Sequence, residues 1–102
     1  MGVNKVFKAL ADPTRRRILE LLQRRDMAAG EISERFDISK PSMSKHFNVL
    51  KEADLIQGRR NGTSIVYRLN VSLLEEALLG LLSKFNRKQK EESWMQAKHS
   101  TA

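Results

Sequence analysis

The side chains best suited to recognise another molecule lie in one short segment, residues 37–53. At about 100° per residue, one side of a helix through this segment carries the apolar residues Met43, Phe47 and Leu50. The other side carries three hydrogen-bond donors with no carboxylate among them, Ser44, Lys45 and Asn48. Donors of this kind on a helix suit the phosphates and base edges of DNA. The segment therefore predicts a recognition helix that buries its apolar side and turns its polar side toward DNA.

A second group of basic side chains stands beside the dipeptide Asn61-Gly62. Asn-Gly is a strong hairpin signal, because a type I′ turn needs positive φ at both of its central residues. The flanking residues 55–60 and 63–69 therefore predict a two-stranded β wing. Arg59 and Arg60 lie next to the turn of a basic protein, so they are expected to contact the DNA backbone or minor groove rather than solvent alone.

Helix and wing together give the predicted DNA contacts, which are Lys40, Ser42, Ser44, Lys45, His46, Asn48, Arg59, Arg60 and Asn61. Lys45 and Asn48 are the best candidates for contact with base edges. His46 falls at the edge of the apolar stripe, and two interpretations stay open for it. It is either a phosphate contact or a packed, hydrogen-bonded histidine.

Apolar periodicity predicts the elements that position these residues. Helices are expected near residues 3–10, 13–25, 29–36, 39–53 and 72–85. Asp12 and Ser39 are predicted N-caps, and Ser72 with Glu75 is predicted to form a capping box. With the wing, these elements give a mainly α, winged helix-turn-helix fold of five helices and a two-stranded β wing. Residues 1–86 are expected to form this domain, and residues 87–102 a polar C-terminal tail.

The first and last predicted helices carry more apolar surface than the core of one chain needs. Left uncovered, this surface would exceed the apolar patches that monomers usually expose. We therefore expect a homodimer that buries the terminal helices across a two-fold axis and holds its recognition helices about 34–36 Å apart. The residues predicted to form this interface are Val3, Val6, Phe7, Leu10, Leu74, Ala77, Leu78, Leu81, Leu82 and Phe85.

The composition narrows the classes of function. Lys and Arg number 19 against 12 Asp and Glu in 102 residues, and the resulting net charge of +7 indicates a polyanionic partner. The chain has no cysteine, which excludes disulfides and thiolate metal sites. It shows no signal-peptide pattern and no apolar run near the length of about 18 residues needed to span a bilayer, so a cytoplasmic protein without membrane insertion is expected. No catalytic constellation and no phosphate-binding glycine loop can be assembled, so neither an enzyme nor a cofactor is expected.

Three linked motifs give the chain a family resemblance. Residues 11–19 (Ala-Asp-Pro-Thr-Arg-Arg-Arg-Ile-Leu) resemble the opening of the second helix in ArsR-type repressors. Residues 39–53 resemble the recognition helix of that family, and residues 58–62 with 67–69 resemble its wing. Within the family, the chain is most similar to the metal-independent branch of sporulation-delaying-protein autorepressors. The resemblance implies a winged helix-turn-helix repressor that dimerises through its terminal helices.

The chain also departs from the family pattern. Many members carry Cys-x-Cys at the third helix or Asp and His ligands on the last one, whereas this chain has no cysteine and no histidine on its last helix. Carboxylates alone do not make the sulfur or nitrogen site that zinc prefers, so no metal site is expected. Ala28 and Ala29 replace the usual Ser or Thr cap before the third helix, and Asp26 is the candidate substitute.

These observations predict a homodimeric transcriptional repressor that occupies an inverted-repeat operator in double-stranded DNA, without a metal sensor site. Control by an antirepressor protein or by an unknown inducer stays open. The alternative from another class is a protein-interaction module that docks on an acidic partner protein. The donor-rich helix and the basic wing favour DNA over that alternative.

Overall fold

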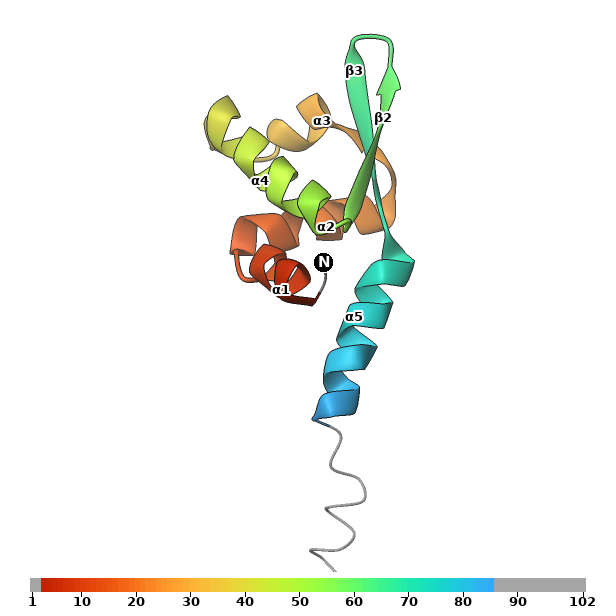
Figure 1. Ribbon diagram of the computed structural model, residues 1–102. Helices are drawn as coiled ribbons and strands as arrows, with labels where there is room; N and C mark the ends of the chain where they lie inside the picture. The colour runs from red at the N-terminus through yellow and green to blue at the C-terminus, as the bar shows by residue number, and fades with distance from the viewer. Residues whose placement is uncertain (1–2, 86–102) are drawn as a thin grey trace, which may run out of the picture.

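The computed structural model describes residues 3–85 and shows the predicted winged helix-turn-helix arrangement (Figure 1). Its elements in chain order are α1 (Val3–Leu10), α2 (Pro13–Arg24), β1 (Met27–Ala28), α3 (Ala29–Ser33), α4 (Lys40–Glu52), β2 (Ile56–Asn61), β3 (Ser64–Leu69) and α5 (Val71–Lys84). The hairpin of β2 and β3 projects at one end, and α5 extends from the other. The predicted tail, residues 87–102, lies outside the described residues.

The core forms where α1, α2, α3 and α4 meet the base of the sheet. The largest fully buried side chains are all apolar: Val6, Ile18, Ile32, Met43, Leu50, Leu55 and Ile56. Complete burial of one aliphatic side chain of this size is worth about 1.5–3 kcal/mol. The apolar stripes of the helices therefore hold α4 against the rest of the domain and leave its opposite side free.

Two helix starts follow the prediction. The Asp12 carboxylate accepts hydrogen bonds from the N–H groups of Thr14 at 2.8 Å and Arg15 at 3.1 Å, with Pro13 at the first position of α2. The Ser39 hydroxyl accepts from the N–H of Ser42 at 3.3 Å at the start of α4. Side chains placed in this way satisfy N–H groups that the helix itself leaves without partners.

Two other predicted caps are wrong. Before α3, Glu31 rather than Asp26 supplies the contact, and its Oε1 accepts from the N–H of Ala28 at 3.1 Å. Before α5, Asn70 takes the place predicted for Ser72, because its Oδ1 accepts from the N–H of Leu73 at 3.2 Å. The helix α3 also ends early, at Ser33, because residues 34–36 close as tight turns instead of continuing it.

The sheet has three antiparallel strands in the order β1-β3-β2, one more than predicted. The extra strand, β1, is two residues long and pairs Met27 with Tyr67 and Ala28 with Val66. A strand this short has no periodicity that a sequence pattern could reveal. It nevertheless ties the base of the hairpin to the segment between α2 and α3.

The turn of the wing lies one residue later than predicted. Asn61 pairs with Ser64 as the last ladder pair, so Gly62 and Thr63 form the turn. Among the described residues, Gly62 has φ of +66° and the one non-glycine with positive φ is Asp54. Positive φ at the first turn position alone is the pattern of a type II′ turn, in which glycine takes that position. The predicted Asn-Gly type I′ turn is therefore wrong in register, although the hairpin is present.

The end of α4 fixes the start of the wing. Asp54 adopts φ of +60°, and the N–H of Leu55 donates to the carbonyl of Leu50 at 3.0 Å. The N–H of Asp54 donates to the carbonyl of Lys51 at 2.9 Å, which completes a Schellman motif. Asn70 then donates from Nδ2 to the carbonyl of Asp54 at 3.1 Å, so the end of α4 and the start of α5 are joined.

Candidate nucleic-acid interface

The helix α4 is oriented as its sequence pattern predicts. Its apolar residues Met43, Phe47 and Leu50 are buried in the core. The predicted contacts that are exposed on it are Lys40, Ser42, Ser44, Lys45 and Asn48. Its first turn holds no acidic residue, so the partial positive charge of the helix N-terminus adds to that of Lys40. This surface combines donors and positive charge on a rigid element.

Lys51 belongs to the same exposed surface, although it is not among the residues predicted from the sequence. It lies seven residues after Ser44, which is two helical turns, and it is exposed. It also borders Arg60 in a hollow that Gly58, Ile65 and Tyr67 complete. The helical repeat that places Ser44 and Asn48 on one side of α4 also places Lys51 there, so the sequence did contain a signal for it.

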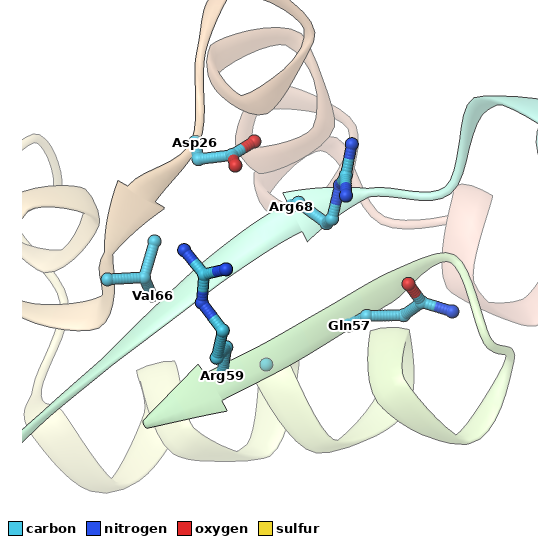
Figure 2. A pocket seen from close by; sticks show the side chains of 6 residues that line it. Asp26, Gln57, Arg59, Val66 and Arg68 are labelled. Atoms are coloured by element: carbon cyan, nitrogen blue, oxygen red, sulfur yellow. The ribbon is translucent and has the colours of Figure 1, made fainter. Parts of the chain in front are cut away.

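The wing arginines point to different faces of the hairpin. Arg60 shares its hollow with Lys51 and therefore lies on the face toward α4. Arg59 lies on the opposite face, in an open hollow lined by Asp26, Gln57, Gly58, Val66 and Arg68. Figure 2 shows Arg59 and Arg68 rising on the same side of the sheet as Asp26. Adjacent residues of a strand point to opposite faces, so Arg59 and Arg60 are not placed to bind the same phosphate.

Arg68, on the wing, is a second basic residue, after Lys51, that is not among the residues predicted from the sequence. It pairs with Gln57 across the ladder and is exposed next to the buried Tyr67. Strand alternation around Tyr67 was the available signal, since it places Arg68 on the outer face. Asn61, the remaining predicted wing contact, is exposed at the end of β2.

An aromatic contact fixes the wing relative to α4. The rings of Phe47 and Tyr67 lie with their centroids 5.0 Å apart and their planes tilted by 32°. A Cβ at Gly58, which pairs with Tyr67, would lie only 3.0 Å from Cε1 of Tyr67 and from Cγ2 of Ile65. Gly58 therefore leaves the room that Tyr67 needs to reach Phe47, and the helix and the wing form one surface.

His46 is packed against the start of α2 rather than free. Its side chain is 19% exposed, and Nδ1 lies 3.1 Å from Nη1 of Arg15 and 3.9 Å from Oδ2 of Asp12. Both partners belong to the start of α2, on the inner side of α4. Of the two interpretations left open, the packed and hydrogen-bonded histidine is the one that the geometry supports.

Asp12 is held in its ionised form at this junction. Burial by itself raises the pKa of Asp12, but the N–H of Arg15, the positive charge that His46 carries in acid and the N–H of Thr14 lower it. The balance leaves the pKa of Asp12 below its ordinary value of 3.8. The neighbouring Arg17 forms an exposed ion pair with Glu20 at 3.2 Å, as expected for a solvated helix residue.

The terminal helices expose apolar side chains on the single chain. The exposed large apolar residues of α1 and α5, with Phe85 directly after α5, are Val3, Val71, Leu78, Leu79, Leu82 and Phe85. Phe7, Leu10, Leu74 and Leu81 are half-buried. Val6 and Ala77 are only 2% and 7% exposed, so they belong to the core of one chain and not to a surface that a second chain could reach. Val6 and Ala77 are therefore not exposed as the predicted interface requires, whereas Leu79, which was not among the predicted residues, is exposed.

Two further observations concern metals and membranes. Within residues 3–85, no three His, Asp or Glu side chains come together in a group that could hold a metal ion. In the same part of the chain, no helix is long and apolar enough to cross a membrane.

Comparisons with known proteins agree with this geometry. The Helix-turn-helix domain family matches residues 10–59. The transcriptional repressor SdpR of Bacillus subtilis (strain 168) is 49% identical over 85 residues, which cover 83% of this chain and 94% of that protein. An arsenical resistance operon repressor of Staphylococcus xylosus is 34% identical over 73 residues, which cover 72% of this chain and 70% of that protein.

Solved structures show the same architecture. An ArsR-like transcriptional regulator from Rhodococcus sp. RHA1 superposes with a TM-score of 0.82 at 26% identity, covering 98% of this chain and 92% of that one. The crystal structure of another ArsR family transcriptional regulator superposes with a TM-score of 0.77 at 29% identity, covering 85% of this chain and 89% of that one.

Proposed function

This chain belongs to the ArsR-type winged helix-turn-helix transcriptional repressors, and from this premise we propose that it acts as a homodimer on an inverted-repeat operator. The family assignment confirms the resemblance drawn from the three sequence motifs. It makes the protein a DNA-binding regulator and not an enzyme. Repression would follow from occupancy, because a dimer bound across a promoter excludes the polymerase from the same DNA. The cytoplasm, where such DNA lies, is the compartment that we propose.

The observation that carries the proposal is the single exposed surface formed by α4 and the wing. Lys45 and Asn48 lie on the side of α4 away from its core stripe, where side chains can reach base edges in the major groove. Lys40, Ser42 and Ser44 extend this surface along the helix. We propose that the first pair reads sequence and that the other three hold the phosphates beside it.

In the wing, we propose that Arg60 makes the stronger DNA contact of the two arginines. It faces α4 and borders Lys51, so a backbone that crosses from the helix to the wing passes both charges. Arg59, on the outer face, and Asn61, at the end of β2, would contact the flanking backbone or minor groove.

A dimer through the terminal helices is supported by the apolar side chains that α1 and α5 expose. Leu79, Leu82 and Phe85 are 65%, 63% and 70% exposed on the single chain. Large apolar patches of this kind on soluble proteins usually mark an interface. Pairing about a two-fold axis would cover the patch on both chains at once and present two recognition helices to successive major grooves.

We also propose that control does not depend on a metal ion. His46, the one histidine of residues 3–85, is held between Arg15 and Asp12 at the inner side of α4. Carboxylates alone favour hard cations and not the zinc or soft ions that sulfur and nitrogen ligands bind. An antirepressor protein or a small inducer would then supply the signal.

Selection of DNA from a random-sequence pool by the purified chain tests the proposal. We expect enrichment of an inverted repeat, retained when a large excess of scrambled duplex is added. Failure to enrich any sequence, together with binding to an acidic protein that duplex DNA does not displace, would instead favour a protein-interaction module.

A further inference from the structure

A chain of polar contacts joins the last turn of α1 to the recognition helix through Arg15. The Nε atom of Arg15 donates to the carbonyl of Ala9 at 2.9 Å, and Nη2 donates to the carbonyl of Lys8 at 2.9 Å. The last carbonyls of a helix lack partners within it, so α1 gains a cap while it orients the guanidinium. The remaining nitrogen, Nη1, lies 3.1 Å from Nδ1 of His46 on α4.

This last contact can be a hydrogen bond in one direction only. Arginine donates hydrogen bonds and has no acceptor, so Nδ1 of His46 must accept. A nitrogen that accepts carries no proton, so this hydrogen bond requires a neutral imidazole with its hydrogen on Nε2. A protonated ring could not accept this bond, and its charge would repel the guanidinium of Arg15.

The same nitrogen has an alternative partner. Nδ1 of His46 lies 3.9 Å from Oδ2 of Asp12, which is already tied to the start of α2 by two backbone N–H groups. Because Asp12 is held there, a protonated His46 would have to move toward it. The charge on the ring thus selects between Arg15 and Asp12.

The other charged groups near His46 do not change which of Arg15 and Asp12 its ring contacts. From α2, Asp12 and Arg15 face the ring, and from α1 the backbone carbonyls of Lys8 and Ala9 hold Arg15. The Lys8 side chain is exposed, and so is that of Lys45, which directly precedes His46 on α4. A shift of α4 at His46 would therefore displace Lys45, the proposed reader of base edges.

We propose that Arg15 is a positioning residue that fixes the rotation of the recognition helix through neutral His46, and that protonation of His46 lowers discrimination for the operator. The inference rests on the proposed function, since it assigns a residue that acts from behind the DNA-contacting surface. It differs from a general effect of acid, because additional positive charge alone strengthens binding to any DNA.

The test compares Arg15→Met with Arg16→Met. Arg16 is a matched control, because its Nη1 donates to the carbonyl of Leu10 at 2.7 Å at the same end of α1, and within the described residues its hydrogen bond does not reach α4. The probes are the duplex that the unmodified protein selects from a random pool and a scrambled duplex of equal composition. The ratio of the two affinities is measured at about pH 8 and about pH 5, on either side of the range in which histidine changes charge.

For the unmodified protein, we expect the ratio of affinity for the selected duplex to affinity for the scrambled duplex to fall about tenfold from about pH 8 to about pH 5. A tenfold change corresponds to the free energy of about one hydrogen bond to a charged group. Arg15→Met should show the low ratio at both pH values, and Arg16→Met should behave like the unmodified protein. His46→Gln, whose amide oxygen can accept from Arg15 at either pH, should lose the pH dependence.

Equal ratios for Arg15→Met and Arg16→Met, or a full pH response in His46→Gln, would overturn the assignment. Thermal unfolding of each variant at each pH shows whether the folded protein is being measured. Should Arg15→Met not fold, the response of His46→Gln decides. Failure of the proposed function itself would appear earlier, as a selection that enriches no duplex.

Discussion

At the scale of single residues, burial separates the side chains that hold α4 in place from those that can touch DNA. Lys45, Asn48 and Arg60 are exposed, whereas His46 between them is packed against Arg15. The position of His46 on the helix does not by itself determine its role, because the residue lies at the border between the apolar and the polar side. Its role depends on residues more than 30 positions away in the chain, as its contact with Arg15 shows.

The first prediction separates residues that contact base edges from residues that contact phosphates. Lys45→Ala and Asn48→Ala should each lower affinity for the selected duplex by about 1–3 kcal/mol and leave binding to scrambled DNA comparatively intact. Arg60→Ala should weaken both kinds of DNA and reduce the slope of log K against log salt by about 0.9 for each phosphate that the variant no longer neutralises. Titrations at several salt concentrations measure both quantities. Full discrimination by the Lys45 and Asn48 variants would place the reading surface elsewhere.

The second prediction concerns Asp12 in acid. The folded state lowers the pKa of Asp12 below 3.8, so the stability that its charge contributes is present above that value and is lost as pH falls through the folded pKa. Asp12→Asn keeps a capping side chain that does not titrate. Urea unfolding at pH 7 and at about pH 3 should show a larger loss of stability for the unmodified protein than for Asp12→Asn. Equal losses in the two proteins would mean that protonation of Asp12 does not contribute to the loss of stability in acid.

At the scale of elements, the sequence predicts what local contacts determine and misses what distant pairing determines. The start of α2 at Asp12, the start of α4 at Ser39 and the buried face of α4 follow from residues within a few positions of each other. The strand β1 forms only because β3 lies beside it. Likewise, the turn at Gly62 follows from the register that Tyr67 and Gly58 set, and not from the Asn-Gly pair alone.

The third prediction tests the coupling of the wing to α4. Gly58→Val would place a branched side chain where even a Cβ would lie only 3.0 Å from Tyr67, so the ring must shift in its contact with Phe47. Overpacking of this kind costs about 1–3 kcal/mol of stability. Gln57→Val, one residue earlier and exposed on the outer face, is the matched control. Chemical unfolding should show the loss for Gly58→Val alone, and a similar loss in both variants would contradict the proposed packing.

At the scale of the whole molecule, the proposed DNA-contacting elements and the exposed apolar residues of α5 lie in different parts of the domain. The wing projects at one end with α4 beside its base, and the exposed apolar residues of α5 lie on the helix that extends from the other end (Figure 1). The net charge of +7 favours the encounter with DNA, but a single chain would present only one recognition helix. Two copies joined through the apolar surface would present two.

The fourth prediction tests that surface. Leu82 is 63% exposed on the single chain, so Leu82→Glu should leave the fold intact and put a carboxylate into the dimer interface at a cost of several kcal/mol, on the order of 2–7. Gln23→Glu adds the same charge on an exposed position of α2 and is the control. Sedimentation at micromolar concentration should give a dimer for the unmodified protein and the control, and a monomer for Leu82→Glu. A dimer that survives Leu82→Glu would move the interface away from α5.

The central claim is that two chains read one operator together, and the stoichiometry of the complex on selected DNA tests it most directly. Sedimentation of the protein with duplexes that carry both half-sites, or only one, counts the chains bound. We predict two chains on the complete site, with half-site centres about 10–10.5 base pairs apart or a multiple of that spacing, and a large loss of affinity when one half-site is scrambled. One chain bound with undiminished affinity to a single half-site would contradict the account.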